Sequence, residues 1–242
     1  MVNLTRIYTR TGDAGRTRLS DLSETAKTDP RVEAYGDVDE ANSLLGLITT
    51  QPDLPEDVRA VLRHIQNELF DCGADLSNPL ASDPPYEPLR IVQASIDRLE
   101  GWCDQFGDPL PPLRSFILPG GTRTAALLHL ARCVVRRAER AGWAAVEVYG
   151  TEPALDDAPG GVNLLALGYL NRLSDLLFIL ARAAGQSSGE VLWVPGKDRE
   201  VTDPRARRQR RRITNPPTSG DGPPGTVPNS AHRPPDLPGD GS

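Results

Sequence analysis

The sequence has 242 residues, of which 38% are hydrophobic, 25% charged and 5% aromatic, and its formal net charge is −6 at pH 7. This composition is typical of a globular chain that buries one large core or two small ones. The negative net charge excludes a general electrostatic attraction to nucleic acid or to an anionic membrane, so any basic function has to be local.

The chain carries no pattern that would direct it out of the cytosol. No stretch approaches the roughly eighteen consecutive apolar residues of a membrane span, and the first residues lack the apolar core of a signal peptide. Cys72, Cys103 and Cys133 are widely spaced and form no CxxC pair, which favours buried free thiols over disulfides or a zinc site. We expect a cytoplasmic protein that binds neither a membrane nor nucleic acid.

The N-terminal segment 9–18 is rich in groups that bind phosphate. It combines threonine hydroxyls, guanidiniums, an aspartate and two glycines, namely Thr9, Arg10, Thr11, Gly12, Asp13, Gly15, Arg16, Thr17 and Arg18. Glycine lets backbone N–H groups converge on an anion, while arginine and threonine donate to its oxygens. The spacing fits neither a Walker A loop nor a GxGxxG turn. The segment is therefore either a phosphate-binding loop or an ordinary polar leader with a glycine turn.

Apolar residues recur with a helical period through most of residues 1–200, and very little of this region alternates with period two. The pattern predicts an all-α fold, a bundle of four or five helices whose sites gather at the ends. We expect helices over 37–51, 55–76, 88–106, 122–141 and 162–184. Two short apolar runs, 116–118 and 146–149, precede glycines and are candidates for extended segments.

Small polar residues line one side of the first predicted helix. Asp39, Asn42, Ser43 and Gly46 share this side and would allow a close approach by another helix or a ligand. Asp39 is a natural counter-ion for the arginines of the fourth helix.

The fourth predicted helix carries a stripe of positive charge. At 100° per residue, Arg132, Arg136, Glu139 and Arg140 fall on one face, opposite an apolar face with Leu127, Leu130, Val134 and Ala138. Such a stripe either binds a polyphosphate or a partner carboxylate, or it is the solvated outer face of a bundle helix.

The fifth predicted helix has two different faces. Asn171, Asp175, Phe178 and Arg182 share one face, opposite a stripe of Leu170, Leu173, Leu177 and Leu180. The mixed face suits either a helix between the core and a ligand or subunit, or a solvent-facing surface with pairs inside the helix.

The C-terminal segment 201–242 differs in composition from the rest. It contains seven arginines, four aspartates, nine prolines and five glycines, so it carries +3 and residues 1–200 carry −9. Such a segment cannot bury enough apolar surface to offset its ordering entropy, and we expect a disordered tail after a folded domain at 1–200. The basic run 205–212 is either a solvated tether or a nucleic-acid patch, and we favour the tether.

His64, His129 and His232 are isolated, and no metal-ligand spacing or Ser/His/Asp arrangement is present. The sequence therefore does not predict acid–base hydrolysis.

Five motifs occur in order and together resemble the PduO-type ATP:cob(I)alamin adenosyltransferases. They are TRTGDAG at 9–15, KxxxxxEAYGxxDExNS from Lys27, FILPGGT at 116–122, RxxxRRAER at 132–140 and YLNRLSDxLF at 169–178. The resemblance runs from about Ile7 to Trp193 and implies the five-helix bundle of that family, assembled as a homotrimer.

The resemblance also implies roles for individual residues. ATP would bind the segment 9–18, together with Lys27, Arg136, Arg137, Glu139, Arg140 and Asn171. Asp39 and Arg132 match a pair that links neighbouring subunits, and with Arg136 they are the residues expected to serve catalysis. Phe116 matches an aromatic that closes over the lower face of the corrin ring, Asp175 matches an aspartate near that pocket, and Phe178 and Trp193 are further aromatic candidates.

The implied reaction transfers the 5′-deoxyadenosyl group of ATP to cob(I)alamin, giving adenosylcobalamin and triphosphate. Cobalt(I) is itself the nucleophile, so the protein only positions two substrates and neutralises the triphosphate with Arg, Lys and Mg²⁺. The residue that ligates Mg²⁺ is not implied. A flavoprotein reductase and an adenosylcobalamin-dependent enzyme are the expected protein partners. The alternative is a carrier that binds ATP or cobalamin on the same scaffold without turnover.

Overall fold

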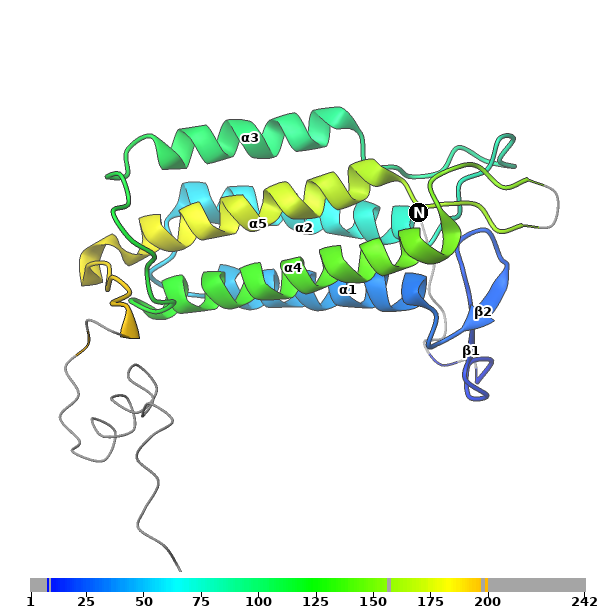
Figure 1. Ribbon diagram of the computed structural model, residues 1–242, viewed down its shortest axis with the longest axis horizontal. Helices are drawn as coiled ribbons and strands as arrows, with labels where there is room; N and C mark the ends of the chain where they lie inside the picture. The colour runs from blue at the N-terminus through cyan, green and yellow to red at the C-terminus, as the bar shows by residue number, and fades with distance from the viewer. Residues whose placement is uncertain (1–7, 9, 156–157, 197–198, 200–242) are drawn as a thin grey trace, which may run out of the picture. The chain divides into compact units, whose positions relative to one another are not determined.

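A computed structural model describes residues 8, 10–155, 158–196 and 199. This part of the chain contains five long helices, a 3-10 turn and a two-stranded hairpin (Figure 1), as follows: β1 (Arg16–Arg18), β2 (Glu24–Ala26), α1 (Pro30–Thr49), α2 (Glu56–Leu76), α3 (Gln93–Gly107), α4 (Arg123–Tyr149), α5 (Leu164–Gly185) and η1 (Gln186–Ser188). The predicted five-helix bundle is confirmed. By contacts, Met1–Trp193 form one compact unit and Val194–Ser242 a second. The predicted tail and His232 lie outside the described residues.

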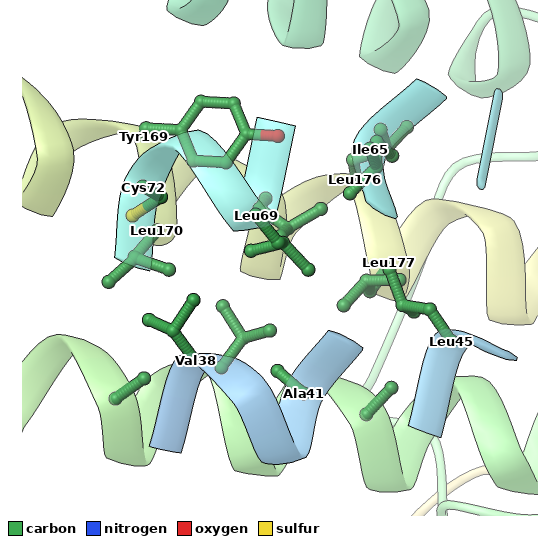
Figure 2. Close-up of a cluster of buried hydrophobic side chains, with 14 of the residues drawn as sticks. Val38, Ala41, Leu45, Ile65, Leu69, Cys72, Tyr169, Leu170, Leu176 and Leu177 are labelled. Carbon is green, nitrogen blue, oxygen red and sulfur yellow. The ribbon is translucent and has the colours of Figure 1, made fainter. Parts of the chain in front are cut away.

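The helices pack as a bundle in which α1 contacts α2 and α4, and α5 contacts α3 and α4. Figure 1 shows α3 lying along α5 on the outer side of the bundle. The leucine stripe predicted on α5 is fully buried at Leu170, Leu173, Leu177 and Leu180. Figure 2 shows two of these leucines, Leu170 and Leu177, in one cluster with Val38 and Leu45 of α1 and Ile65 and Leu69 of α2.

Two helix boundaries differ from the prediction by about two turns. Helix α1 begins at Pro30 instead of residue 37, because the side chain of Asp29 accepts a hydrogen bond from Arg31 N at 2.8 Å and caps the helix. Gly36 therefore lies inside the helix. Helix α4 continues to Tyr149, so the run 146–149 is helical and not extended, and the helix ends at Gly150, which has a φ of 68°.

The hairpin is an addition to the predicted all-α fold. Strands β1 and β2 pair antiparallel with Arg16 opposite Ala26 and Arg18 opposite Glu24. Because of this pairing, part of the predicted N-terminal loop lies in a hairpin that projects from one end of the bundle (Figure 1).

Helix α5 is the one segment, among the described residues, that is long and apolar enough by length and composition to cross a membrane. Its apolar side chains instead fill the centre of the bundle. Tyr169 on this helix is fully buried and its hydroxyl donates to Glu68 Oε2 at 3.0 Å, while Arg98 Nη2 lies 3.0 Å from Glu68 Oε1. A core helix of a helical bundle explains the composition.

The cysteines are free, and only Cys72 is fully buried. Cys103 is half-buried and Cys133 is exposed, so the prediction of buried thiols was wrong for Cys133. Burial raises the pKa of Cys103 to about 11, with the Asp175 charge as a second cause, which keeps this thiol protonated at neutral pH.

Candidate functional site

The hairpin brings most of the predicted phosphate-binding groups together. Thr11, Gly12, Arg16, Thr17, Arg18 and Glu24 line an open pocket of about 550 Å³. Thr9 lies outside the described residues, and Arg10 and Asp13 are in the turn just before β1. Gly15 adopts a φ of 77°, which favours glycine, and its carbonyl accepts from Lys27 N at 2.9 Å.

Gly12 is required for the approach of Lys27 to this pocket. A Cβ on Gly12 would lie 3.1 Å from Lys27 Nζ, so a larger residue would push the ammonium away by a few tenths of an ångström. Arg16 Nε lies 2.6 Å from Glu24 Oε1 across the hairpin, and this bond lowers the pKa of the exposed Glu24 carboxyl. The pocket is therefore lined by cations, hydroxyls and one carboxylate.

A buried network that the sequence analysis missed attaches this hairpin to the bundle. Arg31 is 1% exposed and donates to the carbonyls of Leu76 at 3.1 Å and Gly160 at 2.8 Å, and its guanidinium stacks 4.7 Å from the Tyr149 ring. The Tyr149 hydroxyl donates to Asp29, which also accepts from Thr25 Oγ1 of β2 at 2.5 Å. One sequence signal could have located this network: an aspartate directly before a proline, here Asp29 and Pro30, is typical of the start of a helix.

The shifted pKa values of this network result from its burial and hydrogen bonds. Burial acts to raise the pKa of Asp29, but the hydrogen bonds from Thr25, Tyr149 and the Arg31 amide outweigh it, and the net pKa is lowered. Burial lowers the pKa of Arg31. The network therefore holds Asp29 ionised beside Arg31.

The arginine face of α4 divides into two sets. Arg136 and Arg140 are exposed. Beside them, Glu139 accepts a hydrogen bond from Asn171 Nδ2 of α5 at 3.1 Å, and both of these residues are predicted ATP contacts. Arg137 instead pairs with α1, with its Nε 2.9 Å from Asp37 Oδ1 and a second bond to Glu40. Leu130, predicted on the apolar face, is 52% exposed because the buried face is centred on Ala131 and Val135.

Asp39 and Arg132 do not pair with each other within the chain. Asp39 is exposed in a groove of about 540 Å³ between α1 and α2, lined also by Tyr35, Asn42 and Phe70. Arg132 Nε is buried and has no hydrogen-bond partner among the described residues. Arg132 Nη2 lies 3.7 Å from Cys133 Sγ, and neither Asp39 nor Arg132 has an ion pair among the described residues.

The predicted corrin aromatic lies on a short ribbon before α4. Phe116 is 80% exposed and its carbonyl accepts from Trp193 N at 2.7 Å, while Leu118 N donates to Val191 O at 2.8 Å. The rings of Phe116 and Trp193 meet edge to face at 6.2 Å. We call residues 115–118 and 191–193 the aromatic ribbon.

The aromatic ribbon borders a cavity of about 160 Å³ that reaches His129 and Arg182. Phe178 contacts the His129 ring at 5.9 Å, so it belongs to this end of the bundle. Asp175 is exposed and pairs with Arg172 at 2.8 Å.

The hairpin and the aromatic ribbon lie at opposite ends of the bundle. The hairpin network includes Tyr149, the last residue of α4, whereas the ribbon leads into Arg123, the first. The 27 residues of α4 span about 40 Å at 1.5 Å per residue. Figure 1 shows β1 and β2 at the end opposite the connection from α3 to α4. One copy of the chain therefore cannot bring its own hairpin and Phe116 together.

Comparisons with known proteins agree on one similarity. The family model for cobalamin adenosyltransferase matches residues 7–184. A corrinoid adenosyltransferase of Mycobacterium tuberculosis is 57% identical over 201 residues, covering 83% of this chain and 99% of the relative. A corrinoid adenosyltransferase of Bacillus subtilis is 40% identical over 188 residues, covering 76% and 89%.

Solved structures give the same result. A variant PduO-type ATP:corrinoid adenosyltransferase from Lactobacillus reuteri, complexed with cobalamin and ATP, matches with a TM-score of 0.69 and 35% identity, covering 78% of this chain and 100% of that one. A second variant of the Lactobacillus reuteri enzyme, complexed with ATP, matches with a TM-score of 0.66 and 34% identity.

Proposed function

Since this chain belongs to the cobalamin adenosyltransferase family, we propose that its active site is completed by two copies of the chain within a homotrimer. The chain is an ATP:corrinoid adenosyltransferase, which transfers the 5′-deoxyadenosyl group of ATP to the cobalt of cob(I)alamin and releases triphosphate. Each of the two copies would contribute one set of binding groups to a shared site.

The separation of the hairpin from the aromatic ribbon carries this proposal. The two substrates must meet for transfer, yet the groups suited to each lie at opposite ends of α4. The exposed Asp39 and the half-buried Arg132 are opposite in charge, and neither has an ion pair among the described residues. A neighbouring copy that pairs its Arg132 with Asp39 satisfies both, and brings a second set of groups to the arginine face of α4.

The ATP groups act by charge and position. Lys27, Arg16 and Arg18 on the hairpin and Arg136 and Arg140 on α4 neutralise the triphosphate. Asn171, held by its bond to Glu139, orients the nucleotide. As the Co–C5′ bond forms, the C5′–O bond breaks, and its electron pair leaves on the triphosphate. No proton is transferred, so the site needs no general base.

The pocket at the hairpin also fits Mg²⁺. It offers hydroxyl oxygens from Thr11 and Thr17 and the carboxylate of Glu24, the hard ligands that Mg²⁺ takes together with phosphate oxygens. Among the described residues no group of three or more His, Cys, Asp or Glu side chains is placed to hold a metal on its own. Mg²⁺ would supply charge neutralisation for the leaving triphosphate, bound jointly by these residues and ATP.

On the corrin side, Phe116 supplies an apolar wall. Its 80% exposure leaves the ring open to cover the lower face of the corrin, where it would exclude water and the lower axial ligand. Phe178 and Asp175 on α5 extend the same end of the bundle. We also propose a cytoplasmic location, a flavoprotein reductase as the electron source and an adenosylcobalamin-dependent enzyme as the product acceptor.

The testing experiment is an anaerobic absorbance assay with reduced cobalamin, ATP and Mg²⁺. We expect loss of the cobalt(I) band and formation of light-sensitive adenosylcobalamin with one triphosphate per turnover. Arg136→Ala should raise the KM for ATP while corrinoid binding is retained. Unchanged ATP use would remove Arg136 from the site, and binding of both ligands without product would favour the carrier alternative.

A further inference from the structure

The buried side chain of Arg182 bonds to both segments that lead into the aromatic ribbon. Its Nε lies 2.6 Å from Glu190 Oε1, and its Nη2 donates to the carbonyl of Pro111 at 2.7 Å. Arg182 is 9% exposed, and it lines the same cavity as Ile117 and Leu118. One guanidinium therefore links α5 to the segment that leads to Phe116 and to the segment that leads to Trp193.

The ribbon has few other attachments to the helices. Its two strands are joined to each other through Phe116, Trp193, Leu118 and Val191, and Ser115 Oγ donates to Trp193 O at 3.1 Å. Thr122 Oγ1 donates to Ala184 O at 3.1 Å at the start of α4. With Phe116 largely exposed, the position of its ring depends on what fixes the backbone beneath it.

Arginine suits this position better than any other cation. The Glu190 carboxylate and the Pro111 carbonyl lie on the two different segments that lead into the aromatic ribbon, and the planar fork reaches both at once. The compact ammonium of lysine cannot reproduce this fixed divergent geometry.

We propose that Arg182 is a positioning residue for the corrinoid: through Glu190 and Pro111 it fixes the aromatic ribbon so that Phe116 meets the corrin ring. The proposal rests on the proposed role of Phe116. The hydrogen bonds of the Arg182 side chain go to Glu190 and Pro111, so in this proposal it acts through the ribbon.

The test compares Arg182→Gln, Arg182→Lys and Glu190→Gln in the full-length chain, with Arg98→Gln as the control. Arg98 also pairs with a buried carboxylate, Glu68, but on the side of α3, so its loss costs stability without touching the ribbon. We expect Arg182→Gln to raise the KM for cob(I)alamin by about tenfold and to leave the KM for ATP within about twofold. Arg182→Lys should raise the KM for cob(I)alamin too, but by less than Arg182→Gln does.

A spectroscopic measurement separates positioning from stability. With ATP bound, the absorbance of cob(II)alamin reports removal of the lower axial ligand, and we expect Arg182→Gln and Glu190→Gln to reduce that signal. Glu190 is 26% exposed, so Glu190→Gln should be the milder change. The double variant should reduce the cob(II)alamin signal no more than Arg182→Gln alone does.

Two outcomes would overturn the inference. In the first, Arg182→Gln and Glu190→Gln are folded and leave the KM for cob(I)alamin and the cob(II)alamin spectrum unchanged. In the second, Arg182→Gln raises the KM for cob(I)alamin and the KM for ATP equally, and Arg98→Gln does the same. Phe116→Ala is measured alongside. If Phe116→Ala impairs corrinoid use and the Arg182 variants do not, only this inference fails, whereas an unaffected Phe116→Ala would refute the proposed corrin wall itself.

Discussion

Arg137 of α4 pairs with Asp37 of α1 and not with Asp39, which lies two residues further on. The Arg137 Nε to Asp37 Oδ1 distance is 2.9 Å, and Asp37 is buried against α4. Two residues turn a helix by about 200°, so Asp39 faces the groove between α1 and α2 instead. One aspartate therefore holds two helices of the same chain together, while the other is open to a second copy.

Asp39→Asn should weaken the proposed trimer without unfolding the single chain. The exposed Asp39 has no ion pair among the described residues, so its removal costs the single chain little. Sedimentation velocity should show a shift from trimer to monomer at low micromolar concentration. Arg137→Gln is the matched control. It should lower the free energy of unfolding by about 1–2 kcal/mol, because the buried Asp37 carboxylate loses its ion pair. A trimer that survives Asp39→Asn unchanged would contradict the intersubunit pairing.

Phe116→Ala should impair corrinoid use and leave ATP affinity intact. The ring is 80% exposed, so its loss costs the fold little beyond the edge contact with Trp193. We expect the rate of adenosylcobalamin formation from ATP and cob(II)alamin, with a reductant present, to fall by about tenfold or more, because water and the lower ligand regain access to cobalt. The ATP dissociation constant, measured by calorimetry, is the control and should stay within about twofold.

Arg31→Met should be the most destabilising single change at the hairpin end. Arg31 is fully buried and bonded to backbone carbonyls of Leu76 and Gly160, which methionine leaves without partners. We expect a loss of about 3 kcal/mol in the free energy of unfolding, measured in urea. Arg63→Met, on the exposed face of α2, should change it by less than about 0.5 kcal/mol. Equal losses for both variants would contradict the role of the Arg31 network.

His129 should make the fold less stable below neutral pH. Burial and, second, the charge of Arg132 lower the pKa of His129 from its ordinary value of 6.5. The unfolded chain then binds a proton at a pH where the folded chain does not, so this contribution is full above about pH 6.5 and is lost as the pH falls through the folded value. Urea unfolding at pH 7 and pH 5 should show a smaller difference for His129→Gln than for the wild type. An identical difference would show that His129 does not titrate on unfolding.

The helical period of the apolar residues was enough to predict the bundle, because each helix buries one continuous stripe. The stripe on α5 was placed correctly at all four leucines. The boundaries of α1 and α4 were predicted wrongly, because packing and the Asp29 cap override the local preferences of Gly36 and of the two valines in 146–149.

The candidate site was predictable as a set of residues but not as an arrangement. Motif order located the phosphate-binding segment 9–18, the α4 arginines and Phe116 in the sequence. Their placement at opposite ends of the bundle depends on the direction of α4, which no motif reveals. Arg31 and Arg182 carry no local signature, because their partners are carbonyls and a carboxylate fixed by tertiary contacts.

The packing of α3 on α5 has a consequence for synthesis of the protein. Helix α3 leaves the ribosome before α4 and α5, yet the helix that covers its apolar face is the last to be made. Until α5 has emerged, the faces of α3 and α4 that pack on it stay uncovered, although α1 can already pack on α2 and α4. The nascent chain therefore exposes apolar surface on α3 and α4 until α5 is made and closes the core.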